Sequence, residues 1–266
     1  MVMTRENIIV LDFGGQYSHL ITRRIRDLSV YAELLPYDVS AKKIELLNPS
    51  GIILTGGPSS VYDDNSPKPD YKIFDLDIPI LGICYGLQII VDKMGGSITR
   101  TDKREYGKAT LSISPDQKLF SGISSQTDVW MSHGDATKIL PDNFISIGTT
   151  DNSPYAAISS NNLYGVQFHP EVTHTQDGIK ILKNFLYEIC HCKGLWTMDS
   201  FIDSSINKIK SEVGSDPVLC ALSGGVDSST VALLLHQAIG DRLTCVFVDH
   251  GSVSYTHLTL PTNREV

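Results

Sequence analysis

The stretch "ILGICYGLQII", residues 80–90, places a cysteine between two glycines, after an apolar run and before a helix-like run. The apolar run is typical of a buried strand, and the residues after it have helical spacing. Small residues on both sides of Cys84 suit a sharp strand-to-helix turn that raises the sulfur above a sheet, where helix-start amides favour a thiolate. Two interpretations follow: Cys84 is a nucleophile, or it is a buried structural cysteine, since unpaired cysteine is among the most buried residue types.

Working outward from this turn, strand-like and helix-like runs alternate. Apolar runs predict buried strands at residues 7–14, 51–58 and 78–83, and helical spacing predicts helices at residues 17–28, 85–96 and 177–190. Between 97 and 170 the runs are short and strand-like. The pattern therefore predicts an α/β fold with a mostly parallel central sheet, flanking helices and a mixed or antiparallel extension. In such sheets the site lies at the carboxyl ends of the strands.

The pattern restarts after Lys193 with a polar helix, a strand, a glycine-rich loop, a second helix and a second strand. We therefore predict one domain over residues 1–192 and the beginning of a second α/β domain over residues 197–251. This second part is too short for most such domains. Residues 252–266 match neither part, and we interpret this tail as a truncation, a frameshift or a foreign sequence joined near Gly251.

The composition of the chain excludes some classes of partner and indicates its cellular setting. Its 266 residues carry a formal net charge of -8, which argues against binding nucleic acid through phosphate attraction. No apolar run is long enough to span a bilayer, and the first residues lack a signal-peptide core. The five cysteines are odd in number and lack paired zinc-like spacing. A reducing, cytoplasmic setting is therefore expected, with neither nucleic acid nor membrane as a partner.

Partners for Cys84 occur in two other segments. "GVQFHPE", residues 165–171, places His169 and Glu171 two residues apart in a strand-like segment, so both side chains are expected on one side. A carboxylate beside an imidazole fixes its tautomer and stabilises the imidazolium. Amides at Gly56 and Gly57, together with the one after the cysteine, match an oxyanion hole. Each short pattern alone also fits a simple turn.

Together these segments resemble a known family. The blocks "GGQYSHLITRRIR", "ILTGGPSSVYDDNSP", "ILGICYGLQ", "MSHGD" and "GVQFHPEV" are similar to class I, triad-type glutamine amidotransferases over about residues 7–190. The resemblance implies that Cys84 attacks the side-chain amide of glutamine, His169 transfers the proton and Glu171 orients His169. It implies oxyanion amides at Gly57 and Tyr85, and glutamine-binding residues Gln88, Ser132, His133 and Asp135 with the last three in a loop. His133 also fits a loop histidine with a structural hydrogen bond.

The loop "SGGVDSS", residues 223–229, lies between a predicted strand and helix. Its glycines, hydroxyls and helix N-terminus suit a phosphate. The string resembles the pyrophosphate loop of the ATP pyrophosphatase family, which cleaves ATP between its α and β phosphates. The resemblance implies ATP-binding residues Ser223, Gly224, Gly225, Val226, Asp227, Ser228 and Ser229. Asp227 either caps the helix or, as the family implies, helps hold Mg²⁺.

Both parts in this order resemble the glutamine-hydrolysing GMP synthetase family, a ligase of purine biosynthesis. The resemblance implies that ATP with Mg²⁺ adenylates XMP, that ammonia from glutamine displaces AMP to give GMP, and that the full-length protein is a homodimer. The departure after residue 251 leaves the XMP site outside this chain and puts its synthetase activity in doubt. Two alternatives stay open: a non-catalytic binding or regulatory protein, and the glutaminase of another biosynthetic pathway.

Overall fold

The computed structural model describes residues 6–248, with all side chains except those of residues 101–104. The chain divides into two compact units, Met1–Trp196 and Thr197–Val266, and each is described by itself. The tail predicted at residues 252–266 lies outside the described residues. Between residues 6 and 248, no helix has both the length and the apolar character needed to cross a membrane.

The larger unit is built on a sheet of nine strands in its described part, in the order β2-β1-β3-β4-β9-β8-β7-β5-β6. The first five strands in this order pair in parallel. They are β2 (Tyr31–Pro36), β1 (Asn7–Asp12), β3 (Gly51–Leu54), β4 (Ile80–Ile83) and β9 (Leu163–Val166). The predicted α/β fold with a mostly parallel sheet is therefore confirmed.

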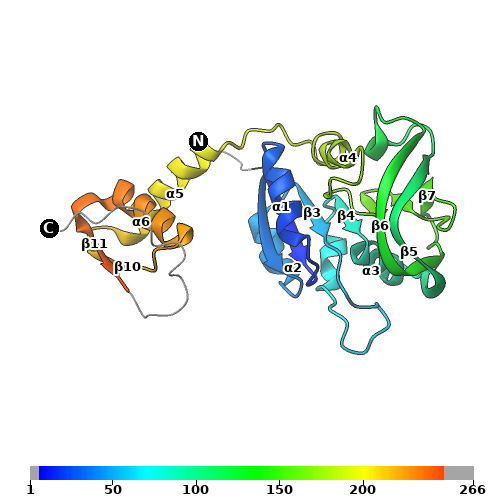
Figure 1. Cartoon of the computed structure of the whole chain (residues 1–266), viewed down its shortest axis with the longest axis horizontal. Helices are drawn as coiled ribbons and strands as arrows, with labels where there is room; N and C mark the ends of the chain where they lie inside the picture. Colours follow the sequence, from blue (N-terminus) through cyan, green and yellow to red (C-terminus); the bar gives the residue numbers. More distant parts are fainter. Residues whose placement is uncertain (1–5, 249–266) are drawn as a thin grey trace. The chain divides into compact units, whose positions relative to one another are not determined.

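Antiparallel strands extend this sheet beyond β9. They are β8 (Ala157–Ser160), β7 (Ile145–Thr149), β5 (Ser97–Ile113) and β6 (Gln126–Ile139). The extension was predicted from short strand-like runs, but β5 and β6 form one long ladder that Figure 1 shows at the far end of the sheet. The register of this ladder sets Glu105 directly opposite His133.

Helices cover both faces of the sheet. They are α1 (Ser18–Asp27), α2 (Ala41–Leu47), α3 (Tyr85–Lys93) and α4 (Gly178–Asn184), with 3₁₀ turns at Tyr71–Asp75 and Lys118–Phe120. The helix predicted at 177–190 is divided between α4 and a π-helical turn, Phe185–Ile189.

The two faces of the sheet follow from the alternation of side chains along each strand. On β1, Ile8 and Val10 join one apolar cluster, which also contains Ile25 of α1. Ile9 and Leu11 join the other cluster, which contains residues of α2 and α3. Because both faces are covered, β1 reads as an unbroken apolar run in the sequence, as expected of a buried parallel strand.

The turn between β4 and α3 is sterically tight. Cys84 has φ 52° and ψ -103°, a left-handed conformation that non-glycine residues rarely adopt and that costs on the order of 1–3 kcal/mol. A Cβ on Gly82 would lie 2.5 Å from the carbonyl carbon and oxygen of Gly86. A Cβ on Gly86 would clash with the backbone carbonyl of Leu54 on β3. The two glycines around the cysteine therefore allow the helix to start directly against the sheet.

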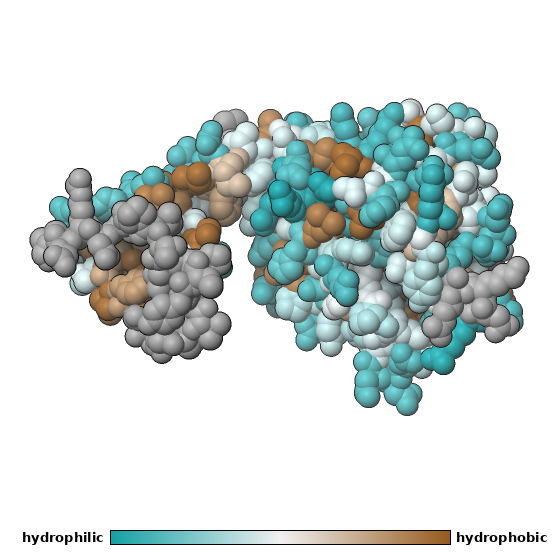
Figure 2. Space-filling model, in the orientation of Figure 1, coloured by the Kyte–Doolittle hydropathy of each residue, from teal (hydrophilic) through white to brown (hydrophobic). Residues whose placement is uncertain are grey.

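The smaller unit contains one βαβ arrangement in its described part. It comprises α5 (Met198–Val213), β10 (Val218–Leu222), α6 (Val226–Ile239), a 3₁₀ turn at Gly240–Arg242 and β11 (Leu243–Phe247), with β10 and β11 parallel. Large apolar side chains stay exposed on both strands, with Leu219 at 70% and Phe247 at 51%. Figure 2 shows apolar surface on this unit where it is not grey. Two strands thus leave uncovered the apolar surface that a further layer normally buries.

The tight turn predicts a stability effect. Gly82→Ala is expected to lower the free energy of unfolding by about 2–3 kcal/mol, because the new methyl group meets backbone that cannot move aside. Chemical denaturation measures the change, with Lys42→Ala on the exposed face of α2 as the control. Equal stability of Gly82→Ala and Lys42→Ala would contradict the steric account.

Candidate active site

The carboxyl ends of four neighbouring parallel strands converge on one cavity of about 330 Å³. Its walls come from the segment after β1, which includes Tyr17 and Ser18, from Gly56 and Gly57 after β3, and from the sulfur-bearing turn after β4. His169 contributes from beyond β9. Convergence at the carboxyl edge is where the sequence predicted the site, because parallel strands all end on the same side of a sheet.

A second cavity, of about 540 Å³, meets the first at Cys84. Gly57 and Ser132 also line both cavities, and the second adds Gln88, His133 and Asp135. The structure therefore brings together the predicted oxyanion and glutamine-binding residues around the predicted nucleophile. Their individual roles remain predictions.

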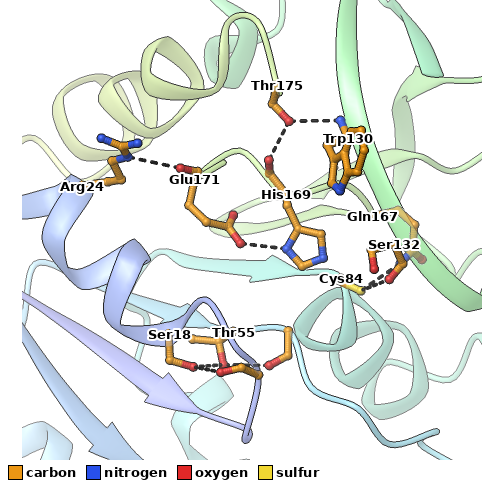
Figure 3. Close-up of polar contacts among 12 residues, drawn as sticks. Ser18, Arg24, Thr55, Cys84, Trp130, Ser132, Gln167, His169, Glu171 and Thr175 are labelled. Carbon is orange, nitrogen blue, oxygen red and sulfur yellow. Dashed lines mark hydrogen bonds and ion pairs between the residues drawn. The ribbon is translucent and has the colours of Figure 1, made fainter. Parts of the chain in front are cut away.

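Cys84 is 6% exposed, and its sulfur has polar neighbours. The Gln167 side-chain amide donates to Sγ over 3.6 Å, and Sγ lies 3.6 Å from the Ser132 carbonyl oxygen (Figure 3). Cys84 and His169 line the same cavity, and the Cys84 side chain raises the pKa of the His169 imidazole. Cys84 belongs to a hydrophobic cluster, but it also opens to both cavities, so the sulfur is not sealed in hydrocarbon.

His169 and Glu171 form a buried pair. The His169 Nδ1 lies 2.7 Å from the Glu171 Oε1. Figure 3 shows the two side chains pointing toward each other. The prediction that both stand on a strand was wrong, because β9 ends at Val166 and the two residues lie in the turn that follows. Hydrogen bonds fix this turn instead of strand pairing: the Thr175 hydroxyl donates to the His169 carbonyl, and the Arg24 Nε donates to the Glu171 carbonyl.

The environment of His169 favours its charged form. Burial lowers the pKa of this imidazole, but hydrogen bonds to Cys84 and Glu171 and the negative charge of both side chains outweigh burial and raise the pKa to about 10. The ring therefore stays protonated through neutral pH and loses its proton only as the pH rises toward 10.

The predicted oxyanion residues lie at the junction of the cavities. Gly57 and Tyr85 both line the larger cavity with Cys84. The Tyr85 hydroxyl points elsewhere and donates to the Pro67 carbonyl over 2.8 Å, and burial raises the pKa of this phenol to about 12. Only the backbone of Tyr85 is thus available for the predicted role. A Cβ on the neighbouring Gly56 would lie 3.1 Å from the His169 Cε1, so a larger residue there would press on the imidazole.

The predicted loop at residues 132–135 is part of strand β6, which corrects the sequence analysis. The Gln88 side-chain amide donates to the Asp135 carbonyl over 3.1 Å and ties α3 to this strand. His133 makes two hydrogen bonds, a partly buried one to the Asp135 carbonyl and a buried one to Glu105. Burial lowers the pKa of His133 despite the nearby Glu105 carboxylate. His133 therefore makes the structural hydrogen bonds that its second interpretation predicted, and it also lines the larger cavity.

Several residues of the site were not predicted. Tyr17 packs edge-on against the His169 ring with centroids 5.3 Å apart, and Gln167 reaches the sulfur. Both residues lie inside sequence blocks that carry the family resemblance. Tyr17 follows β1 and Gln167 precedes His169 by two residues, and these positions were the signals that could have placed them at the site. Arg100 and Asp63 line the larger cavity, with the guanidinium 3.4 Å from the carboxylate. No short sequence pattern links these two.

In the smaller unit, the segment 223–229 runs from the end of β10 into the first turn of α6, as predicted. The Ser228 hydroxyl lies 3.3 Å from the Ser223 amide nitrogen and closes the loop. The N-cap of α6 is Gly225 and no side chain caps it, so the capping interpretation of Asp227 was wrong. Asp227 lies exposed in the first helical turn. In residues 6–248 no three His, Cys, Asp or Glu side chains group as a metal site.

The fold and the geometry around Cys84 define an α/β protein with a cysteine–histidine–glutamate site at the carboxyl edge of a parallel sheet. Residues 9–189 match the family model described as Glutamine amidotransferase class-I. The chain belongs to this family, which confirms the family resemblance and the fold predicted for its larger part.

Curated relatives carry a more specific name. The chain is 53% identical over 253 residues to "GMP synthase [glutamine-hydrolyzing]" of Heliobacterium modesticaldum, and 52% identical over 251 residues to the protein of that name from Bacillus subtilis. Both matches cover 94% of this chain and 49% of the relative. The chain thus spans about half the length of these relatives.

Solved structures agree on the fold. A putative GMP synthase subunit from Thermoplasma acidophilum superposes with a TM-score of 0.63 at 34% identity, covering 70% of this chain and 94% of that one. A glutamine amidotransferase from Thermotoga maritima gives a TM-score of 0.52 at 19% identity, covering 88% of this chain and 90% of that one. The second match shows the fold alone.

The His169 environment predicts a measurable titration. In the wild-type chain the ring is expected to titrate far above pH 6.5, and in Glu171→Gln its pKa is expected to fall because one of the charges that raises it is gone. NMR of ¹³Cε1-labelled histidine measures both values, and the spectrum of His169→Asn identifies the resonance. A ring that titrates near pH 6.5 in the wild-type protein would contradict this electrostatic account.

Proposed function

We propose that this chain releases ammonia from the side-chain amide of glutamine, with Cys84 as nucleophile, His169 as the proton-transfer group and Glu171 as the residue that orients His169. One observation carries the proposal. The cysteine is held in a strained turn between two cavities, and its imidazole partner is fixed by a carboxylate at 2.7 Å. A strained backbone at a nucleophile is typical of functional sites.

The first half of the reaction forms a thioester. The Cys84 thiolate attacks the amide carbon, so that a carbon–sulfur bond forms and the carbonyl oxygen becomes an oxyanion. The backbone amides of Gly57 and Tyr85 would stabilise this oxyanion. His169, protonated at neutral pH, gives its proton to the amide nitrogen. The carbon–nitrogen bond then breaks and ammonia leaves.

The second half consumes water. His169, now neutral, takes a proton from a water molecule that attacks the thioester carbon. The carbon–sulfur bond breaks, glutamate leaves and the sulfur returns as a thiolate. Glu171 stays hydrogen-bonded to Nδ1 throughout and thus keeps Nε2 as the nitrogen that exchanges the proton.

The larger cavity supports glutamine as the substrate. Arg100 and Asp63 at its wall offer a cation and an anion, which match the α-carboxylate and α-ammonium groups of an amino acid. Gln88 and residues 132–135 of β6 line the same cavity together with Cys84. The rival interpretation of a non-catalytic protein leaves the strained cysteine and the charged imidazole without a function.

For the pathway, we propose that the ammonia serves GMP synthesis from XMP and ATP, with this chain carrying the glutaminase half and the start of the ATP pyrophosphatase half. Two observations support this. The curated relatives that match 94% of the chain are named GMP synthase, and the segment 223–229 is a glycine-rich turn at a helix N-terminus. The glutaminase of another pathway would not need that second segment.

The same segment fits a magnesium–phosphate complex. Exposed glycine amides and the N-terminus of the 14-residue helix α6 suit the phosphate oxygens. Mg²⁺ commonly binds one or two carboxylates together with substrate phosphates, and Asp227 is an exposed carboxylate in the first turn. ATP would supply the adenylyl group that activates XMP, while Ser223 to Ser229 would hold the pyrophosphate that leaves.

The glutaminase proposal is tested with Cys84→Ala. Its rate of glutamate release is expected to be at least about 10³-fold lower than that of the wild-type chain, because the thioester cannot form. A coupled glutamate dehydrogenase assay measures the rate. Cys192→Ala is the matched control, since burial raises the pKa of that thiol to about 11 and it lies outside both cavities. Equal rates for Cys84→Ala and wild type would overturn the proposal.

The phosphate loop is tested by binding alone. Isothermal titration of the chain with Mg²⁺ and pyrophosphate is expected to show binding that Asp227→Asn weakens by about tenfold, or about 1.4 kcal/mol. Asp241→Asn, in the 3₁₀ turn after α6, is the control and is expected to bind like the wild type. Binding that is unchanged in Asp227→Asn would remove Asp227 from the proposed site.

A further inference from the structure

Glu105 is a buried carboxylate that contacts His133, a residue in the wall of the larger cavity. It lies on β5 directly opposite His133 on β6, and its side chain is 8% exposed. Its Oε2 lies 3.0 Å from the His133 Nε2, and the Thr150 hydroxyl donates to its Oε1 over 3.3 Å. Burying a carboxylate is costly unless it is hydrogen-bonded. Both oxygens of the buried Glu105 carboxylate have hydrogen-bond partners, so we expect this side chain to have a role beyond filling space.

The hydrogen bonds of His133 define its protonation at one nitrogen. Nδ1 lies 2.9 Å from the Asp135 carbonyl oxygen, which can only accept, so Nδ1 carries a hydrogen. The contact between Nε2 and the Glu105 carboxyl group then needs one further proton, on either atom. In both cases the pair is neutral overall and the ring is held from both sides. Without Glu105, only the Asp135 carbonyl would hold the ring.

This pair belongs to a continuous chain of hydrogen bonds. It runs from Thr150, next to the end of β7, through Glu105 and His133 to the Asp135 carbonyl, which also accepts from Gln88 on α3. The last three residues line the larger cavity, and Glu105 does not. The chain thus connects the antiparallel extension to the helix that starts at Cys84.

We propose that Glu105 is a positioning residue for the glutamine site: through His133 it fixes the part of β6, residues 132–135, that forms one wall of the larger cavity. The identity of the ligand rests on the proposed function. Glu105 touches neither glutamine nor the sulfur, so its effect falls on recognition of the amino acid. This wall meets the Cys84 sulfur through the Ser132 carbonyl, 3.6 Å away. The reactivity of Cys84 toward a small reagent is therefore expected to change much less than recognition of the amino acid.

Two electrophiles separate these effects. The first is a glutamine analogue in which a chloromethyl ketone replaces the side-chain amide, and the second is iodoacetamide. In a Cys245→Ser background, which removes the exposed thiol, Glu105→Ala is expected to react at least about tenfold more slowly with the analogue. Its reaction with iodoacetamide is expected to stay within about twofold of the parent. In the glutaminase assay, KM is expected to rise about tenfold with kcat within about threefold.

The conservative variant tests the hydrogen bond itself. In Glu105→Gln the amide can donate to Nε2 of a neutral His133 ring, so the analogue is expected to react within about threefold of the parent rate. Asp128→Ala is the matched control on the same ladder, because its carboxylate pairs with Lys108 over 2.8 Å and lies outside both cavities. Thr150→Val removes the hydrogen bond to Glu105, together with the one that the Thr150 hydroxyl accepts from the Ser153 amide. It is expected to raise KM about threefold, even if Glu105→Ala does not fold.

The outcomes separate this proposal from the proposed function. A parent protein that fails to react with the analogue overturns glutamine as the ligand, and with it the basis of this inference. A parent that reacts, together with an unchanged Glu105→Ala, overturns the role of Glu105 alone. Equal slowing with both electrophiles, or failure of Glu105→Gln to recover, shows a general structural effect and also overturns it.

Discussion

The larger unit depends on one steric constraint, the left-handed backbone at Cys84 between β4 and α3. The helix begins at the residue after the cysteine, and there is room for it only because Gly82 and Gly86 carry no Cβ. The strain at the cysteine is offset by the apolar packing of β4 and α3, whose residues are almost all buried. A sharp turn, a close helix and an accessible sulfur are therefore consequences of the same three residues.

Topology completes the site around this turn. The strand order sets β3 and β9 on either side of β4, so the segments after these strands flank the sulfur at one edge of the sheet. The antiparallel β5–β6 ladder adds a wall that parallel strands alone do not provide. One side of the site thus comes from the ends of parallel strands and the other from the middle of a long strand, where neighbouring strands determine the position of each residue.

This difference between the two sides of the site explains which of its residues could be predicted from the sequence. The strand-to-helix turn at Cys84 and the parallel core follow from local patterns, and both were predicted. Strand β2 and helix α2 were not, because Tyr31–Leu47 mixes polar and apolar residues without a clear period. The turn that joins His169 to Glu171 resembled a strand because its residues alternate, although contacts with α1 and Thr175 define its shape. The role of Glu105 depends on a strand register that pairs it with His133, 28 residues further along the chain, and no local pattern contains this register.

The site contains two buried histidine–carboxylate pairs with opposite charge preferences. His169 lies 2.7 Å from Glu171 and His133 lies 3.0 Å from Glu105, yet the pKa of the first is raised to about 10 and the pKa of the second is lowered. Burial lowers the pKa of both rings, and the Cys84 side chain is among the groups that raise the pKa of the first ring but not of the second. The two rings also repel each other when both are charged. Because the His133–Glu105 pair is neutral overall, it does not oppose the charge on His169, whose imidazolium stays beside the sulfur, where an amide leaving group needs a proton. The role of His133 is then to hold β6 in place.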